Sequence, residues 1–72
     1  MSRFTLVGVD GNAFSIMGYT ARALKKAGLQ DKVDMMYEEA ESGDYYNLLA
    51  VCDGYVHMAN EALGLIDDEE EY

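Results

Sequence analysis

The residues best suited to chemistry lie on one face of a predicted helix. Asp53, His57 and Glu61 follow one another at intervals of four residues, which places them on the same side of a helix. Carboxylates and imidazoles are ligands for divalent metals. At about 1.5 Å per residue the three span about 12 Å, so only adjacent pairs could share one ion, and a site would need a further ligand from elsewhere, such as a dimer mate. We therefore expect a surface ladder, with no metal or other cofactor.

Two other patterns could suggest catalysis or anion binding. Cys52 and His57 could form a nucleophile pair, but five residues on a helix put them about 140° apart, and Cys52 fits the apolar stripe as a small core residue. The turn Asp10-Gly11-Asn12 could offer backbone N–H groups to an anion, but Asp10 would repel it and no P-loop pattern follows. We expect no catalytic residues and no enzymatic activity.

The distribution of charge is the strongest functional signal in the 72 residues. Residues 1–32 hold all five basic residues and two aspartates, a balance of +3, whereas residues 33–72 hold twelve carboxylates and no Lys or Arg. The net charge is −9. A field of this sign repels nucleic acid and anionic membrane and attracts basic surfaces. The expected partner is therefore a protein with a basic surface, and neither nucleic acid nor a membrane.

The acidic residues could imitate a nucleic acid. Duplex DNA carries one charge per roughly 1.7 Å of axis, and a helix bundle covered with carboxylates presents a comparable though sparser anionic surface. Tyrosine is enriched at interfaces, and two tyrosines fall beside the carboxylates. The alternative is a solvated face that serves only solubility. The predicted partner-binding residues are Asp34, Glu38, Glu41, Asp53, Glu61, Asp67, Asp68, Glu69, Glu70, Glu71, Tyr46 and Tyr55.

The pattern of apolar residues predicts three helices. The first covers residues 13–27, with Asn12 as N-cap, Gly28 after its end, and Phe14 among its apolar residues. The second covers 32–41 with Asp31 as N-cap, and the third covers 45–63 with Asp44 as N-cap and Gly64 at its end. Gly54 lies inside the third helix and leaves open a break there.

The first residues predict a short strand. Residues 3–9 are rich in β-branched and aromatic types. A single strand must find an edge, so it could pair with a second copy in a homodimer or lie against the helices as an extended arm. The expected fold is mainly helical (α+β), with one domain over residues 1–64 and a flexible acidic tail over 65–72.

Several segments resemble one group of proteins. The run from Asp10 to Gly18, the run from Arg22 to Gly28, and the run from Glu39 to Tyr45 with Leu48, Leu49 and Cys52 resemble short proteins of phages, prophages and mobile elements that open with a "DGNAF" turn. The resemblance covers residues 5–56 and carries over no activity. By size and acidity the chain also looks like small phage inhibitors of the anti-CRISPR and anti-restriction type.

These observations favour a non-enzymatic interaction module. The sharper hypothesis is a phage-type inhibitor that mimics nucleic acid and blocks the basic groove of a bacterial nucleic-acid-binding protein or CRISPR effector. The alternative is a small structural or accessory subunit, possibly homodimeric, whose acidity serves only solubility. The single cysteine, the absence of a signal-peptide pattern and the lack of a long apolar run predict a location in the bacterial cytoplasm.

Overall fold

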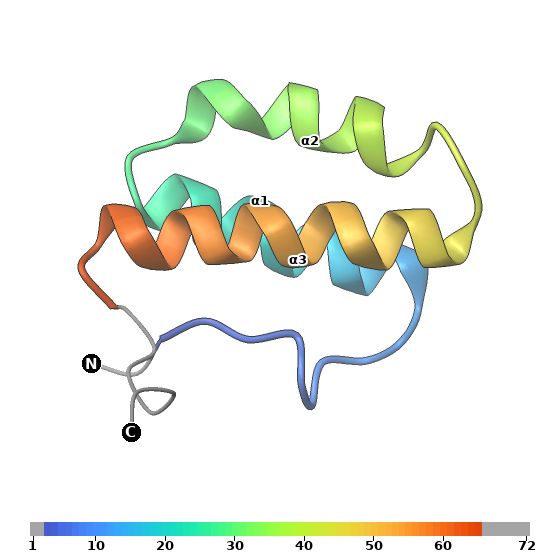
Figure 1. Ribbon diagram of the computed structural model, residues 1–72, viewed down its shortest axis with the longest axis horizontal. Helices are drawn as coiled ribbons and strands as arrows, with labels where there is room; N and C mark the ends of the chain where they lie inside the picture. The colour runs from blue at the N-terminus through green and yellow to red at the C-terminus, as the bar shows by residue number, and fades with distance from the viewer. Residues whose placement is uncertain (1–2, 66–72) are drawn as a thin grey trace.

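The computed structural model describes residues 3–65. The described chain contains three α-helices, α1 (Ala13–Lys26), α2 (Val33–Ala40) and α3 (Tyr45–Ala62), and one turn of 3-10 helix, η1 (Gln30–Lys32). In Figure 1, α3 runs in the same direction as α1, while α2 returns in the opposite direction. Each helix packs against the other two. The mainly helical fold expected from the sequence is confirmed.

The ends of α1 and α3 form as their sequences predict. Asn12 accepts a hydrogen bond from the Phe14 backbone N–H at 2.8 Å, and Asp44 accepts one from the Asn47 N–H at 2.9 Å. These side chains satisfy backbone donors that the first helical turn leaves without partners. Gly28 and Gly64 follow α1 and α3 with φ of 77° and 73°, a conformation that glycine adopts without steric cost. The helix α3 continues through Gly54 without a break.

The start of α2 differs from the prediction. Asp31 lies inside η1, and α2 begins at Val33, directly after η1. Lys32 occupies the N-cap position of α2, and no side chain makes a capping hydrogen bond there. The backbone N–H of Lys32 instead donates to the carbonyl of Leu29 at 2.9 Å. The expectation that Asp31 caps this helix was therefore wrong, because a 3-10 turn connects the preceding loop to α2.

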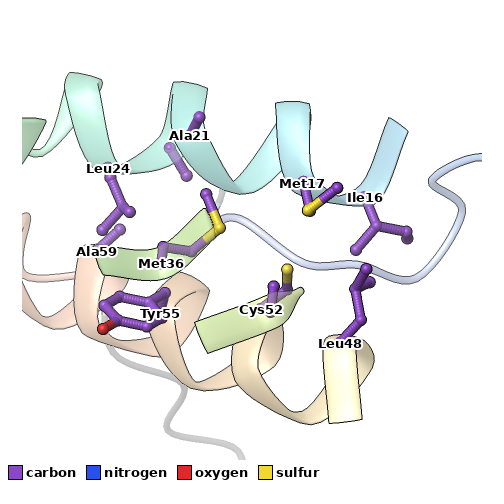
Figure 2. Packing of buried hydrophobic residues seen from close by; sticks show 11 residues of the cluster. Ile16, Met17, Ala21, Leu24, Met36, Leu48, Cys52, Tyr55 and Ala59 are labelled. Carbon is purple, nitrogen blue, oxygen red and sulfur yellow. The ribbon is translucent and has the colours of Figure 1, made fainter. Parts of the chain in front are cut away.

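The core lies between the three helices. Leu24 of α1, Met36 of α2 and Cys52 of α3 are fully buried, and Figure 2 shows the side chains of the three helices converging. Cys52 is a core residue, as predicted. Its burial raises the pKa of the thiol above its usual range, although a hydrogen bond with Thr20 acts in the opposite direction. Thr20 itself is satisfied by donating to the carbonyl of Ile16 at 2.9 Å.

Phe14 was expected among the apolar core residues of the first helix, but its side chain is 79% exposed. The buried face of α1 is centred on Thr20 and Leu24, which lie roughly 100° around the helix axis from Phe14. Because Thr20 is polar, the pattern of apolar residues does not reveal that it lies at the centre of the buried face. Phe14 consequently lies at the edge of the buried face, in the first turn of the helix.

No strand occurs in residues 3–65, so the predicted strand over residues 3–9 was wrong. A turn closes within this segment: the Val9 N–H donates to the Leu6 carbonyl at 3.1 Å, and Gly8 adopts a φ of 87°. These residues form an N-terminal arm that lies along the bundle on the side away from α2 (Figure 1). The arm lies against the helices, as one of the two alternatives expected, but it bends at this turn and is not extended throughout.

One buried side chain takes the place of a neighbouring strand for the N-terminal arm. The Asn60 amide oxygen accepts from the Phe4 N–H at 2.7 Å, and its nitrogen donates to the Phe4 carbonyl at 2.9 Å. The Tyr19 hydroxyl accepts from the Thr5 N–H at 2.9 Å. Both backbone groups of Phe4 are thus hydrogen-bonded within the chain.

Candidate partner-binding surfaces

The first candidate surface is the solvent-facing side of α2. Asp34, Glu38 and Glu41, called the α2 row below, recur at helical spacing and all three are exposed. The opposite side of α2 is buried through Met36 and Ala40. Within residues 3–65, none of the three carboxylates takes part in an ion pair. The row therefore lies on the outer face of α2, as the sequence predicted for these three residues.

Glu39 lies between the members of the α2 row in the sequence but has a different role. Its carboxylate accepts a hydrogen bond from the Tyr55 hydroxyl at 3.1 Å, and its backbone carbonyl accepts from the Ser42 hydroxyl and from the Asn47 amide. These bonds connect the end of α2 with α3. Glu39 is thus a structural link between two helices and is turned away from the α2 row.

Tyr55 was expected near the polar margin of α3 as an exposed contact residue, but it is only 8% exposed. Its ring lies in the core beside Met36 and Ala59 (Figure 2). Burial raises the pKa of Tyr55, and the hydrogen bond and negative charge of Glu39 raise it further. The prediction assumed that the polar hydroxyl of Tyr55 would face solvent, but the hydroxyl donates a hydrogen bond to Glu39 within the molecule. A buried ring cannot serve as an exposed anchor.

The second group of predicted acidic residues lies on a different side of the bundle. Asp53 and His57 are two residues before and after Tyr55, about 200° around the axis of α3, so they face away from α2. Both line a hollow of about 210 Å³ that the N-terminal arm completes through Arg3, Phe4 and other residues. The structure therefore separates the predicted acidic set into two surfaces and does not bring Asp53 or Glu61 to the α2 row.

Part of the predicted ladder on α3 is present as an exposed contact between His57 and Glu61. The His57 Nε2 lies 3.2 Å from a carboxylate oxygen of Glu61, and both side chains are exposed. Such solvated pairs contribute little to stability. Among residues 3–65, no group of three or more His, Cys, Asp and Glu side chains is placed to hold a metal ion. Cys52 is buried while His57 is exposed, so the thiol and the imidazole do not form a pair.

The Asp10-Gly11-Asn12 turn is occupied by its own contacts. The Asp10 carboxylate accepts from the Asn12 N–H at 3.2 Å, and the Asn12 side chain caps α1. The Tyr45 hydroxyl donates to the Gly11 carbonyl. These bonds fix the turn against the start of α3 and fit the structural turn that we expected.

The N-terminal ends of α1 and α3 form a surface that the sequence analysis did not predict. Phe14 from α1 and Tyr45 from α3 both line a groove of about 380 Å³, as do the buried residues Met17 and Leu48. Two carboxylates, Glu41 and Asp44, also line this groove. A signal was present, since an aromatic residue lies within two positions of each N-cap, Phe14 after Asn12 and Tyr45 after Asp44. That the two helix starts meet depends on the packing of the helices and cannot be inferred from spacing alone.

Tyr46 is exposed, as a contact residue must be, with 79% of its surface accessible. Its ring meets that of Tyr45 edge to face, with centroids 6.4 Å apart. It therefore extends the aromatic surface beside the groove. The remaining predicted contact residues, Asp67 to Glu71, and nearly all of the predicted tail lie outside the described residues.

The chain matches no protein-family model, no curated protein and no solved structure. Within residues 3–65, no helix is both long enough and apolar enough to cross a membrane. A function is therefore inferred from the exposed carboxylates and aromatic side chains described above.

Proposed function

We propose that this protein is a non-enzymatic, acidic interaction module that binds the basic surface of a nucleic-acid-binding protein in place of the nucleic acid. The α2 row supports this proposal. Its three carboxylates are exposed, lie on one face and have no ion-pair partner within residues 3–65. A surface of this kind binds arginine and lysine side chains through charge-assisted hydrogen bonds.

The spacing of the α2 row suits a groove built for phosphates. From Asp34 to Glu41 the helix rises about 10 Å, so the row carries one charge per roughly 5 Å along its axis. One strand of duplex DNA carries one phosphate per roughly 3.4 Å of axis. The row is sparser than DNA but follows a line of similar scale. We assign the proposed mimic to one helix, because Asp53 and Glu61 lie on another side of the bundle.

This activity suits the class of small phage inhibitors that the chain resembles in size and acidity. Such a protein would act in the bacterial cytoplasm and block the basic groove of a defence complex, such as a CRISPR effector, without any chemical step. The partner would be held by charge, so binding would weaken steeply with rising salt.

A pull-down from nuclease-treated bacterial lysate tests the proposal with two matched variants. One carries Asp34→Asn and Glu38→Gln in the α2 row, and the other carries Asp53→Asn and Glu61→Gln on α3. Each removes two of the charges that make up the net −9. We expect nucleic-acid-binding proteins to be retained at low salt by the intact protein and by the α3 variant, and to be lost with the α2 variant. Equal retention by both variants, or capture of no such protein, would contradict the proposal.

A further inference from the structure

The groove at the N-terminal ends of α1 and α3 is lined mainly by apolar and aromatic residues. Its walls are the rings of Phe14 and Tyr45, which are 79% and 42% exposed. Met17 and Leu48 are buried and present apolar surface to it. The Tyr45 hydroxyl donates to the Gly11 carbonyl, so one wall is held in place before any partner arrives. Pockets of this kind accept the central anchor residues of protein interfaces.

The charge around the groove selects the type of partner. Glu41 and Asp44 line it, and no Lys or Arg does. The guanidinium of Arg22 lies beside Gly18, one helical turn from Phe14, but does not line the groove. Lys25 and Lys26 lie in the last turn of α1, at least about 16 Å along the helix axis from Phe14. A segment that carries basic residues beside an apolar one matches both parts of this surface. A second copy of this chain does not match, because it brings the same carboxylates and a net charge of −9.

The groove and the α2 row form one continuous surface. Glu41 belongs to the row and also lines the groove. A partner whose basic residues lie along α2 therefore brings its neighbouring side chains to the groove between Phe14 and Tyr45. Two kinds of contact would then act together, with the carboxylates binding positive charge and the rings burying apolar surface.

We propose that the groove receives an apolar side chain from a Lys- or Arg-rich segment of the partner protein. This inference rests on the proposed function, which supplies the basic partner, and it adds an apolar anchor that a purely electrostatic mimic lacks. The anchor makes part of the affinity insensitive to salt and distinguishes a basic protein segment with an apolar side chain from other basic surfaces.

Two synthetic peptides and one substitution test the groove. The first is an 18-residue helical peptide of lysine and leucine, with leucines along one face, and the second has glutamine in place of every leucine, so that both carry the same charge. We expect the leucine peptide to bind the intact protein more tightly. Phe14→Ala should weaken binding of the leucine peptide by more than about fivefold and leave the glutamine peptide unchanged. Equal affinity of the two peptides, or an unchanged affinity after Phe14→Ala, would overturn the inference.

Control variants separate the groove from general effects on the protein. Val7→Ala shortens an apolar side chain that is 85% exposed and does not line the groove, and it should leave both affinities unchanged. Phe14→Leu keeps an apolar wall and should retain most of the binding. In ¹⁵N–¹H correlation spectra, the leucine peptide should shift the amide signals of residues 13–17 and 43–48 more than the glutamine peptide does. Equal shifts of these signals by the two peptides would contradict the inference.

The failure of the groove and the failure of the α2 row give different results. Asp34→Asn with Glu38→Gln removes charges of the row that do not line the groove. This double substitution should lower the affinity of the protein for both peptides to the same extent. If both peptides bind this variant normally, the proposed function fails, whereas an unaltered response to Phe14→Ala shows that the inference about the groove fails.

Discussion

Two aromatic clusters differ in whether another part of the chain covers them. Phe4 and Tyr19 form a closed cluster, in which the rings meet edge to face with centroids 6.1 Å apart and the N-terminal arm is hydrogen-bonded in place. Phe14 and Tyr45 line the groove, and the Tyr46 ring meets that of Tyr45 edge to face. These three residues are called the open cluster, and 79% of Phe14 remains exposed. Aromatic residues are thus covered by the N-terminal arm in the closed cluster and remain exposed to solvent in the open cluster.

The difference between the clusters follows from what lies beside each one. Asn60 is buried next to the closed cluster and binds both backbone groups of Phe4, so the arm can cross the helices without unsatisfied polar groups. Beside the open cluster the chain places the short loop after α2, with Gly43 and Asp44 lining the groove. We conclude that the closed cluster stabilises the fold, whereas the open cluster is the better candidate for binding.

The largest expected effect comes from removing the two hydrogen bonds between Asn60 and Phe4, which hold the N-terminal arm over the closed cluster. Asn60→Ala leaves the Phe4 N–H and carbonyl without their partner and should lower the free energy of unfolding by about 2–3 kcal/mol. Urea unfolding followed by circular dichroism measures this loss, and hydrogen exchange should show faster exchange of the Phe4 and Thr5 amides. A loss below about 0.5 kcal/mol would show that the arm does not depend on Asn60.

The same substitution in the two clusters gives a direct comparison. Phe4→Ala removes a half-buried ring that packs against the core and should cost about 1–2 kcal/mol of unfolding free energy. Phe14→Ala removes an exposed ring and should cost less than about 0.5 kcal/mol. Thermal unfolding of both variants measures the difference. Equal losses would mean that the distinction between closed and open clusters is wrong.

The Tyr55–Glu39 hydrogen bond joins α3 to α2. Its removal tests whether the hydroxyl of a buried tyrosine contributes to the stability of the fold. Tyr55→Phe should lower the unfolding free energy by about 1 kcal/mol. Because the pKa of Tyr55 is raised above 10.0 in the folded protein, its contribution is constant at lower pH and declines as pH rises past 10, where the unfolded chain ionises first.

Unfolding measured between pH 8 and pH 11 checks this sign. The intact protein should lose more stability above pH 10 than the Tyr55→Phe variant does. Cys52 contributes in the same direction from about pH 9, since burial raises the pKa of its thiol. The comparison is therefore best made in a Cys52→Ala background. Parallel pH profiles for the two proteins would contradict the assignment to Tyr55.

The last prediction is a gain in stability in α3, the helix that carries both Asn60 and Tyr45. Gly54 lies inside α3, and a Cβ atom added there would have no neighbour within 4 Å. Gly54→Ala should raise the unfolding free energy by about 0.5–1 kcal/mol without altering either cluster. Urea unfolding measures the gain, and a loss of stability would indicate a constraint at this position that the packing does not show.

Local signals predicted most of the helical structure. Asn12, Asp44, Gly28 and Gly64 act within a few residues of their own positions, so their roles could be inferred from the sequence. The arm could not, because the partner that replaces a neighbouring strand is Asn60, 56 residues away from Phe4. Long-range hydrogen bonds of this kind leave no periodic pattern in the sequence.

The candidate site was predicted in part. The exposure of the α2 row follows from its helical spacing opposite Met36 and Ala40. The positions of Phe14 and Tyr55 were predicted incorrectly, because an aromatic ring at the margin of a helix face can be buried or exposed depending on the neighbouring helix. The groove depends on the meeting of two helix starts, which only the tertiary structure shows.

The central claim is that the α2 row occupies a site built for nucleic acid, and competition with duplex DNA tests it most directly. The immobilised protein is first loaded with the nucleic-acid-binding protein that it captures, and duplex DNA is then added at constant ionic strength. The account predicts that DNA releases the captured protein in proportion to its concentration. Retention of the captured protein at saturating DNA would show that the two do not share a site and would contradict the account.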